Sequence, residues 1–267
     1  MSRSTLSKTL KSKTVSYPFK LSNQLEELIN NNVPSITVLL CTLNEEKNLP
    51  QVLPRIPDYI DEVLIVDGHS KDNTVSIAKK LYPNIRVLYQ PGRGKGDALR
   101  YGIREAKSDI IVMLDADGSM APEEIPRFVA LLLNGYDFVK GSRFMSGGGT
   151  TDMSTHRKFG NWVFVTLTNL FHRCRYTDLC YGYNAFWKKS FEKVMFKGDG
   201  FEVETEINIK IRKVGLKVTE APSYEAQRLN GNGNLHSLKD GWRILTTIFK
   251  EIRKNEEKQK VDAQNIC

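Results

Sequence analysis

The chain has 267 residues, of which 40% are hydrophobic and 26% are charged, and this composition is ordinary for a soluble globular protein. It excludes a chain that is disordered throughout, a collagen-like repeat and a small disulfide-stapled scaffold. The 39 basic and 31 acidic side chains leave a formal charge of +8, which favours anionic partners such as phosphates, nucleic acids or lipid headgroups.

Short apolar runs alternate with helical stretches from residue 36 onward. This alternation predicts βαβ units and an α/β fold with a Rossmann-like, doubly wound, mostly parallel sheet flanked by helices. Ligands on such sheets bind at the carboxyl ends of the strands. The expected strands are 36–40, 62–66, 85–88, 110–114, 137–139 and 216–219, and the expected helices are 45–56, 73–81, 96–106, 122–133, 157–171, 201–214 and 238–254.

Three parts of the chain differ in character. Residues 1–33 form a polar, basic extension with a short helical segment near 21–29, residues 34–236 form the main α/β domain, and residues 237–267 form an amphipathic helix and a charged tail. No apolar run approaches the roughly 18 residues of a membrane-spanning helix, and the start lacks the apolar core of a secretory signal. We therefore expect a cytoplasmic protein.

Cysteine and histidine spacing gives no metal signature. The four cysteines lack a C-x-x-C pair, and the four histidines lack metal-ligand spacing, so neither a zinc site nor a disulfide framework is expected. Basic residues are spread along the chain and are not clustered with aromatic residues. This distribution argues against a nucleic-acid partner.

Two carboxylates, Asp115 and Asp117, come at the end of an expected strand. Side chains at positions i and i+2 of an extended chain point to the same side. Two carboxylates at the mouth of a parallel sheet can hold a hard divalent cation such as Mg²⁺ or Mn²⁺. The alternative is that they only begin the turn after the strand, as acidic residues often do.

Other polar residues follow the neighbouring strands. Asn44 and Glu45 come after the first expected strand and Asp67 after the second, while Lys95 and Gly96 open a helix behind a glycine-rich segment. Backbone N–H groups at such a helix start, together with the lysine charge, suit a diphosphate. The spacing G-x-G-x-G differs from the dinucleotide fingerprint, and no P-loop is present, which disfavours hydride transfer and nucleotide hydrolysis.

These motifs, taken in order, resemble those of family 2 glycosyltransferases with a GT-A fold, and in particular the dolichol- and polyprenyl-phosphate sugar synthases. The resemblance covers roughly residues 35–235. It rests on Thr42-Leu43-Asn44-Glu45-Glu46-Lys47-Asn48, on Ile65 to Thr74, on Gly94-Lys95-Gly96-Asp97-Ala98-Leu99 and on Leu114-Asp115-Ala116-Asp117, and is extended by 141–144, 157–158 and 178–186.

The resemblance implies a donor pocket. Thr42, Glu45 and Asp67 would line its nucleoside part, and Asp115 and Asp117 would bind the metal and the diphosphate, with Ser119 beside them. Two positions depart from the family pattern: Gly68 stands where a second acidic residue is common, and Ser119 stands where glutamine is frequent. The first leaves the base open, and the second leaves the metal coordination open.

On the acceptor side, the resemblance assigns Arg143, Arg157 and Arg228 to an acceptor phosphate, which arginine suits through bidentate recognition. The alternative is that each is a solvated or salt-bridged surface arginine. Glu204 is the candidate general base among three alternating glutamates, of which at most one or two can face the site. A phosphate acceptor needs little base help, because its oxygen is already anionic near neutral pH, whereas a hydroxyl acceptor would need a base.

The expected activity is transfer of a sugar from a UDP- or GDP-sugar to a polyprenyl or dolichyl phosphate, by a metal-dependent hexosyltransferase that inverts the anomeric carbon. Two alternatives stay open. One is transfer to a small soluble phosphorylated acceptor, as in glucosyl-phosphoglycerate synthases. The other is a non-catalytic protein that binds nucleotide sugars.

The last expected helix carries apolar residues at steps of three and four, including Trp242, Ile248 and Phe249, with basic residues between them. Its apolar face either docks on the main domain or lies on an anionic membrane surface, which would make the protein peripheral on the cytoplasmic membrane face. The apolar residues of helix 157–171, such as Trp162 and Leu170, are expected in the core or an interface, and the alternative is that they face a membrane.

Overall fold

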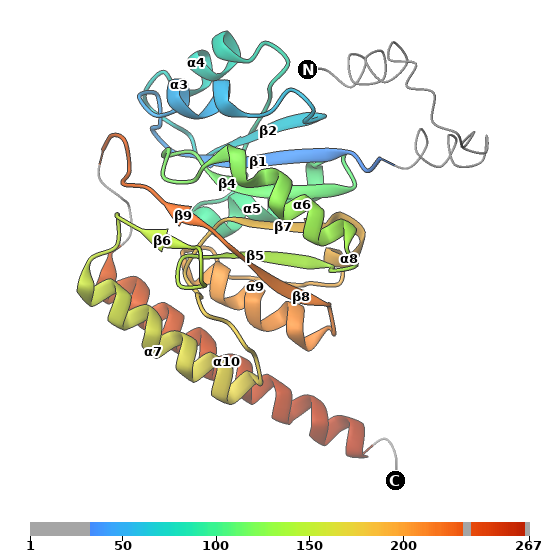
Figure 1. Ribbon diagram of the computed structural model, residues 1–267. Coiled ribbons are helices and arrows are strands. Elements are labelled where there is room, and N and C mark those ends of the chain that lie inside the picture. Colours follow the sequence, from blue (N-terminus) through green and yellow to red (C-terminus); the bar gives the residue numbers. More distant parts are fainter. Residues whose placement is uncertain (1–32, 232–235, 265–267) are drawn as a thin grey trace, which may run out of the picture.

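The computed structural model describes residues 33–231 and 236–264, and Figure 1 shows their arrangement. The short helix expected near 21–29 lies outside these residues. Within the described ranges, no helix has both the length and the apolar content needed to cross a membrane.

A seven-stranded sheet in the order β3-β2-β1-β4-β7-β5-β8 forms the centre of the molecule. Strand β7 runs antiparallel to β4 and β5, and the other neighbouring pairs are parallel. The expected mostly parallel sheet is therefore confirmed. The strands are β1 (Ile36–Thr42), β2 (Glu62–Asp67), β3 (Arg86–Tyr89), β4 (Ile110–Asp115), β5 (Phe138–Ser142), β7 (Asn184–Trp187) and β8 (Val218–Pro222).

Helices cover both faces of this sheet, as a doubly wound fold requires. One face carries α3 (Leu49–Val52), η1 (Leu53–Arg55), α4 (Thr74–Leu81), η2 (Pro122–Glu124) and α6 (Ile125–Leu133). The other carries α5 (Lys95–Glu105), α8 (Lys188–Phe191) and α9 (Glu202–Lys213).

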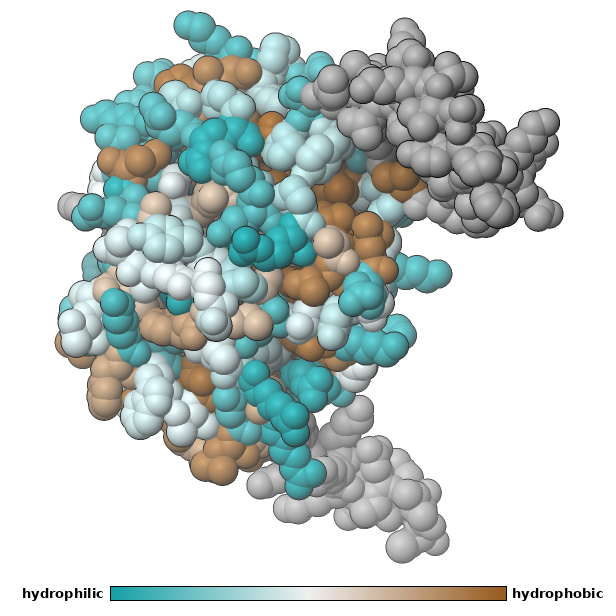
Figure 2. Space-filling model, viewed as in Figure 1, coloured by the Kyte–Doolittle hydropathy of each residue, from teal (hydrophilic) through white to brown (hydrophobic). Residues whose placement is uncertain are grey.

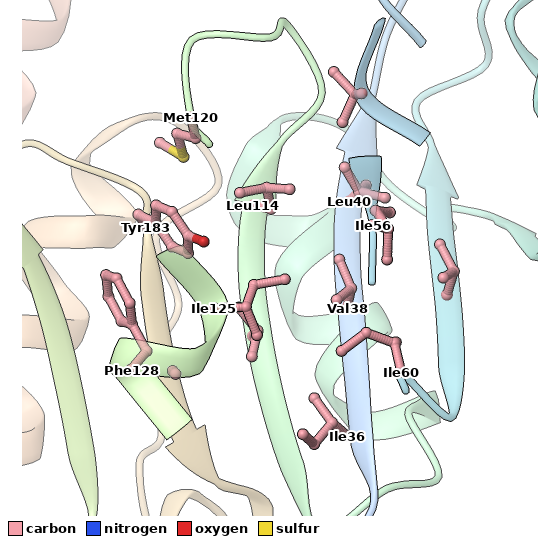
Figure 3. Close-up of a cluster of buried hydrophobic side chains, with 14 of the residues drawn as sticks. Ile36, Val38, Leu40, Ile56, Ile60, Leu114, Met120, Ile125, Phe128 and Tyr183 are labelled. Carbon is pink, nitrogen blue, oxygen red and sulfur yellow. The ribbon is translucent and has the colours of Figure 1, made fainter. Parts of the chain in front are cut away.

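Alternation along the strands divides the core between these two layers. In β1, Val38 and Leu40 face the first layer and Leu39 faces the second, because successive side chains of a strand point to opposite faces. Figure 3 shows the first cluster, in which the ring of Phe128 stacks on that of Tyr183 at a centroid distance of 4.3 Å. Burial on both faces explains why the strands read as continuous apolar runs.

Helices α7 (Thr155–His172) and α10 (Ser237–Gln264) lie side by side and pack against α9 (Figure 1). Ile244 and Ile248 of α10 are buried with Val165 of α7 and Ile209 of α9. The expected docking of the last helix on the main domain is thus confirmed for part of its apolar face.

The outer faces of α7 and α10 carry exposed apolar side chains. Trp162 and Leu170 of α7 are 61% and 69% exposed, and Trp242 of α10 is 66% exposed. Trp162 and Leu170 therefore do not lie in the core of the described chain, because α10 and α9 pack against the opposite side of α7, and an interface or membrane-facing role stays a prediction. Figure 2, viewed as Figure 1, shows hydrophobic surface among hydrophilic side chains at the lower left of the molecule, where α7 lies.

Three local features of the structure differ from the expectations. The helix expected over 45–56 is reduced to α3 and η1, each with a proline in its first turn, because Pro54 cannot donate a helical hydrogen bond. The antiparallel strand β7 was not predicted, since its four residues carry no distinctive pattern of their own. A small parallel pair, β6 (Gly149–Thr150) and β9 (Tyr224–Glu225), was also not expected.

Candidate active site

A cavity of about 1020 Å³ opens where β1 and β4 end. Its wall is built from segments far apart in the sequence, which the parallel strands bring to one edge of the sheet. Most of the residues singled out from the sequence line it: Thr42, Glu45, Lys95, Asp115, Asp117, Ser119, Arg143, Arg157, Glu204 and Arg228.

The two strand-end carboxylates both face this cavity. Asp115 is the last residue of β4, and Asp117 follows in a turn whose centre, Gly118, has a φ of +82°. A side chain at Gly118 would be strained there and would meet Leu229. Ser119 donates to Asp117 Oδ1 from its backbone N at 2.9 Å and from its hydroxyl at 2.7 Å. Ser119 thus orients Asp117, and Asp117 Oδ2 is left for other partners.

Lys95 joins the first carboxylate to the α9 helix. Its Nζ lies 2.8 Å from Asp115 Oδ1 and 2.7 Å from Glu204 Oε1. Burial alone lowers the pKa of Lys95, but the two carboxylates outweigh it and hold this pKa above its usual value. The lysine therefore stays charged, and the charge of Glu204 is compensated by it.

Arg228 joins the second carboxylate to the loop after β1. Its Nη2 lies 3.0 Å from Asp117 Oδ2, and its Nη1 lies 3.2 Å from Glu45 Oε1. Burial raises the pKa of Glu45, while hydrogen bonds from Asn48 and the Arg228 charge oppose that rise. Arg228 is thus the principal positive charge beside Glu45.

Arg143 reaches the cavity wall but is committed to structure. Its guanidinium is buried, and all three nitrogens donate: to both oxygens of Asp178 at 2.7 and 2.9 Å, to both oxygens of Glu225 at 3.0 Å, and to the carbonyl of Cys180. The guanidinium also lies 4.7 Å from the ring centroid of Tyr181. Of the two alternatives for this arginine, the structure shows the salt bridge, and it is buried and not at the surface.

Arg157 stands in a different environment. It lies in the first turn of α7, its side chain is 30% exposed, and its Nη1 is 3.4 Å from Asp152 Oδ2. Within the described part of the chain this is its one ion pair. Most of its donors therefore remain available to an anion in the cavity.

Three of the expected ligand residues lie off the cavity lining. Asp67 is fully buried and accepts hydrogen bonds from the Thr42 hydroxyl and from the backbone and hydroxyl of Ser70. Asn44 accepts from the backbone of Lys71 at 2.8 Å. The Gly96 amide donates to the carbonyl of Asp199 at 2.9 Å. These groups shape the loops behind the wall.

The glycines at the start of α5 serve the same packing. A side chain at Gly94 or Gly96 would sit about 2 Å from a carbonyl oxygen of the segment 198–199 (2.2 Å and 1.9 Å). Glycine is therefore needed for the close approach of two backbones. The glycine-rich segment brings Lys95 to the cavity, while its own backbone packs against the backbone of residues 198–199.

The three alternating glutamates of α9 separate as expected. Glu204 faces the cavity, whereas Glu206 accepts from the backbone N–H groups of Lys197 and Gly198 and pairs with Lys210. Glu202 lines a second cavity of about 580 Å³ with Glu206. The expectation that at most one or two face the site is confirmed.

Two free cysteines, Cys41 and Cys180, line the wall of the cavity. Burial raises the pKa of Cys41 and of Cys180 to about 12 each, so both remain thiols near neutral pH.

The residues at the cavity fit a divalent cation bound partly by substrate. Across the described ranges, no group of three or more histidine, cysteine, aspartate or glutamate side chains could hold a metal by itself. Four carboxylates (Glu45, Asp115, Asp117, Glu204) face two cations (Lys95, Arg228), which leaves a formal charge of −2. Mg²⁺ is usually held in this way, by one or two carboxylates with substrate phosphates and water.

Several neighbours of the site were not found from the sequence. A Cβ at Gly182 would lie 2.9 Å from Lys95 Nζ, 3.0 Å from Glu204 Oε1 and 3.1 Å from Asp115 Oδ2, so only glycine leaves this cluster undisturbed. Asp178 lies in the stretch 178–186 that extends the resemblance, and Glu225 lies outside every quoted motif. The pairing of both carboxylates with Arg143 follows from tertiary contacts alone.

Comparison with known proteins gives the class. The model of the family described as "Glycosyl transferase family 2" matches residues 37–195. The chain belongs to this family, and its fold is that of the GT-A glycosyltransferases. This confirms the fold and the family expected from the sequence.

Several glycosyltransferases of known sequence share about 30% identity with this chain. The chain is 31% identical over 229 residues to the glycosyltransferase AglJ of Haloferax volcanii, covering 83% of this chain and 73% of that protein. It is 29% identical to an undecaprenyl-phosphate mannosyltransferase of Micrococcus luteus (75% and 87% covered) and 30% identical to a dolichol-phosphate mannosyltransferase of Pyrococcus furiosus (82% and 62%).

Solved structures show the same fold at lower identity. Glucosyl-3-phosphoglycerate synthase of Mycobacterium tuberculosis, in complex with Mn²⁺, UDP and glucosyl-3-phosphoglycerate, aligns with a TM-score of 0.65 and 21% identity, covering 87% of this chain and 85% of that one.

Proposed function

We propose that this glycosyltransferase moves a sugar from a nucleoside-diphosphate sugar to a polyprenyl phosphate, with a divalent metal, Mg²⁺ or Mn²⁺, held by Asp115 and Asp117. The observation that carries the proposal is the pair of carboxylates at the end of β4 in a large cavity, where they belong to a cluster of four carboxylates and two cations. When bound, the metal would supply a Lewis acid that offsets charge on the leaving diphosphate.

On the donor side, the chain's own residues would position the substrate. Thr42 and Glu45 line the cavity next to Gly68, where the base and ribose would lie. Lys95, which remains charged, would stand close to the diphosphate as a point charge. Asp67 would act through Thr42 and Ser70, because its carboxylate is hydrogen-bonded to both.

On the acceptor side, Arg157 and Arg228 would hold the phosphate and align its oxygen with the anomeric carbon for a single in-line displacement with inversion. Such alignment is a major part of the rate of a two-substrate reaction. Because that oxygen is already anionic near neutral pH, no strong base is required. This agrees with the pairing of Glu204 with Lys95 at 2.7 Å. Arg143 would support the wall through Asp178 and Glu225.

The lipid acceptor is supported by the printed names of two relatives, an undecaprenyl-phosphate and a dolichol-phosphate mannosyltransferase. It is also supported by the exposed Trp162 on α7 and Trp242 on α10, because α10 also carries the exposed basic residues Lys239, Arg243 and Lys250, the last two of which line the second cavity. A surface that combines aromatic and basic side chains suits an anionic lipid leaflet. The protein would then lie peripherally on the cytoplasmic face of a membrane.

A soluble phosphorylated acceptor is the second candidate. It is suggested by the name of a structural neighbour, glucosyl-3-phosphoglycerate synthase. The 21% identity to that protein supports a shared fold and does not by itself identify the acceptor. A screen of UDP- and GDP-sugars with Mg²⁺ or Mn²⁺, with and without a short-chain polyprenyl phosphate, tests the proposal. Product that forms only with the lipid phosphate supports it. Binding of nucleotide sugar without transfer to any acceptor would instead indicate a non-catalytic binding protein.

A further inference from the structure

The side chain of Arg228 occupies the position from which a metal on Asp117 would have to be approached. Its Nη2 is 3.0 Å from Asp117 Oδ2, and Asp117 Oδ1 is already taken by Ser119. A cation and this guanidinium therefore compete for the same oxygen. Both ends of the bridge are largely shielded from water, since the side chains of Arg228, Asp117 and Glu45 are 22%, 14% and 9% exposed.

The backbone that carries Arg228 is fixed to the same turn. The Ala226 amide donates to the Ser119 carbonyl at 2.8 Å, and the Leu229 amide donates to the Asp117 carbonyl at 3.3 Å. Farther on, the Asn230 side chain donates to Asn48 Oδ1 at 3.0 Å. These bonds hold the backbone of 226–230 against the turn, and none of them uses the guanidinium of Arg228, so this side chain can change partners without breaking them.

We propose that Arg228 is an internal counter-ion of the metal site. In the donor-free enzyme it neutralises Asp117 and Glu45, and it leaves Asp117 when a divalent cation binds. The released guanidinium then faces the cavity as a binding group for phosphate. Cation binding and acceptor recognition are thereby linked through one side chain. This inference rests on the metal role proposed above for Asp117.

Two effects of the arginine act in the same direction. It competes directly for Asp117 Oδ2, and its positive charge repels any cation that approaches the pair of carboxylates. Removing the charge should therefore tighten binding of the metal alone. A residue whose role is limited to the acceptor phosphate would leave metal affinity unchanged.

The test measures Mn²⁺ affinity of the full chain without nucleotide, by the electron paramagnetic resonance signal of free Mn²⁺. We expect Arg228→Gln to bind Mn²⁺ about tenfold more tightly than wild type, a change of about 1.4 kcal/mol. Arg228→Lys, which keeps the charge but cannot bridge both carboxylates equally well, should fall between them. The matched control is Arg157→Gln, which removes the same charge from the same cavity wall but not from Asp117, and its affinity should stay near that of wild type.

A further variant separates this inference from the proposed function. Asp117→Asn should weaken Mn²⁺ binding, which shows that the measured site is this one. If Asp117→Asn has no effect, the metal role of Asp117 is wrong and the inference falls with it. If Asp117→Asn weakens binding but Arg228→Gln leaves it within twofold of wild type or weakens it, the counter-ion role is overturned while the proposed function stands. Because Arg228→Lys retains the charge, it also gives a result should the glutamine variant fold poorly.

Discussion

The half of the cavity that we propose for the donor and the half that we propose for the acceptor are built in different ways. Asp115, Lys95 and Thr42 stand at strand ends or a helix start, so their positions follow from the sheet itself. Arg157 and Arg228 stand on α7 and on the loop after β9, and their roles depend on the partners that the loops bring to them. The sheet sets the positions of the proposed donor residues, whereas the partners around each proposed acceptor arginine determine whether its nitrogens remain available.

The arginines themselves illustrate this most clearly. Arg143 and Arg157 line the same cavity, but Arg143 is buried with all three nitrogens bonded, while Arg157 makes one long ion pair, with Asp152, among the residues that the structure describes. The same residue type therefore forms a structural cross-link at one position, whereas at the other it has unused donors, which we propose bind an anion. The predictions below test this division, from the largest expected effect to the smallest.

The strongest effect should come from the donor half. Asp117→Asn should lower sugar transfer at least about 1000-fold, because losing one charge weakens the hard-cation site, whose metal would offset several kcal/mol of developing charge. Initial rates of transfer with Mn²⁺ measure this, and Glu123→Gln, at an exposed ion pair with Arg55, is the control. Full activity of Asp117→Asn, or wild-type activity that survives EDTA, would refute the metal role.

Variants of Arg143 and Arg157 should affect different properties, the first stability and the second activity. Arg143→Ala should lower the free energy of unfolding by about 3–5 kcal/mol, since it leaves Asp178 and Glu225 buried without their cation. Arg157→Ala should change stability by no more than about 0.5 kcal/mol but lower transfer to a phosphate acceptor. Urea unfolding and transfer rates measure both. Equal stability losses in the two variants would contradict the division.

The buried pair also predicts a pH dependence. Burial by itself raises the pKa of Asp178, but Arg143 outweighs it and holds this pKa below its ordinary value of 3.8. The stability that the pair contributes is therefore fully present above pH 3.8 and is lost as the pH falls through the lower folded-state value.

The unfolding free energies of wild type and Asp178→Asn should accordingly differ by a constant amount from about pH 8 to 5 and converge only below about pH 4. Urea titrations at several pH values measure this difference. A difference that already shrinks between pH 7 and 5 would show that Asp178 titrates in that range and that Arg143 does not hold it ionised.

A glycine of the donor half should be sensitive to the smallest side chain. Gly182→Ala places a Cβ within about 3 Å of Lys95, Asp115 and Glu204 (2.9 to 3.1 Å), and we expect transfer to fall about ten- to hundredfold through misplacement of these groups. Gly160→Ala, in open space on α7, is the matched control and should leave activity unchanged while adding up to about 1 kcal/mol of stability. Equal activity of the two variants would show that the cluster adjusts freely.

The weakest effect concerns the membrane. Trp242→Ala combined with Phe249→Ala should reduce binding to anionic vesicles about tenfold by removing apolar burial. Binding of the wild type should also weaken as salt rises, since each Lys or Arg near an anionic leaflet contributes about 1 kcal/mol that salt screens. Vesicle flotation measures both. A protein that stays unbound at low salt would rule out the lipid-facing role of α7 and α10.

The difference between the halves also explains what the sequence could predict. Apolar strands that end in polar residues are a local pattern of the sequence. This pattern predicts the sheet with its two helical layers, and it predicts that Asp115 and Asp117 lie near Lys95. The resemblance to the family extended this to Arg157 and Arg228. These expectations needed no knowledge of tertiary contacts.

Other features depended on contacts that no local pattern shows. The burial of Asp67 behind Thr42 and Ser70 follows from how the loop after β2 folds back, not from its place at a strand end. The bond from Gly96 to Asp199 joins segments a hundred residues apart. Strand β7 and the exposure of Trp162 likewise reflect which elements pack together, which the apolar pattern of a single helix does not determine.

The acceptor is the central claim, and one competition experiment tests it directly. The wild-type enzyme, with Mn²⁺ and a labelled nucleotide sugar that it accepts, is offered a short-chain polyprenyl phosphate and a phosphoglycerate together, and the label is partitioned between organic solvent and water. We predict that the label enters the organic phase as a sugar–phosphate–lipid. Label that remains in the aqueous phase as a glycosylated phosphoglycerate would contradict the lipid acceptor.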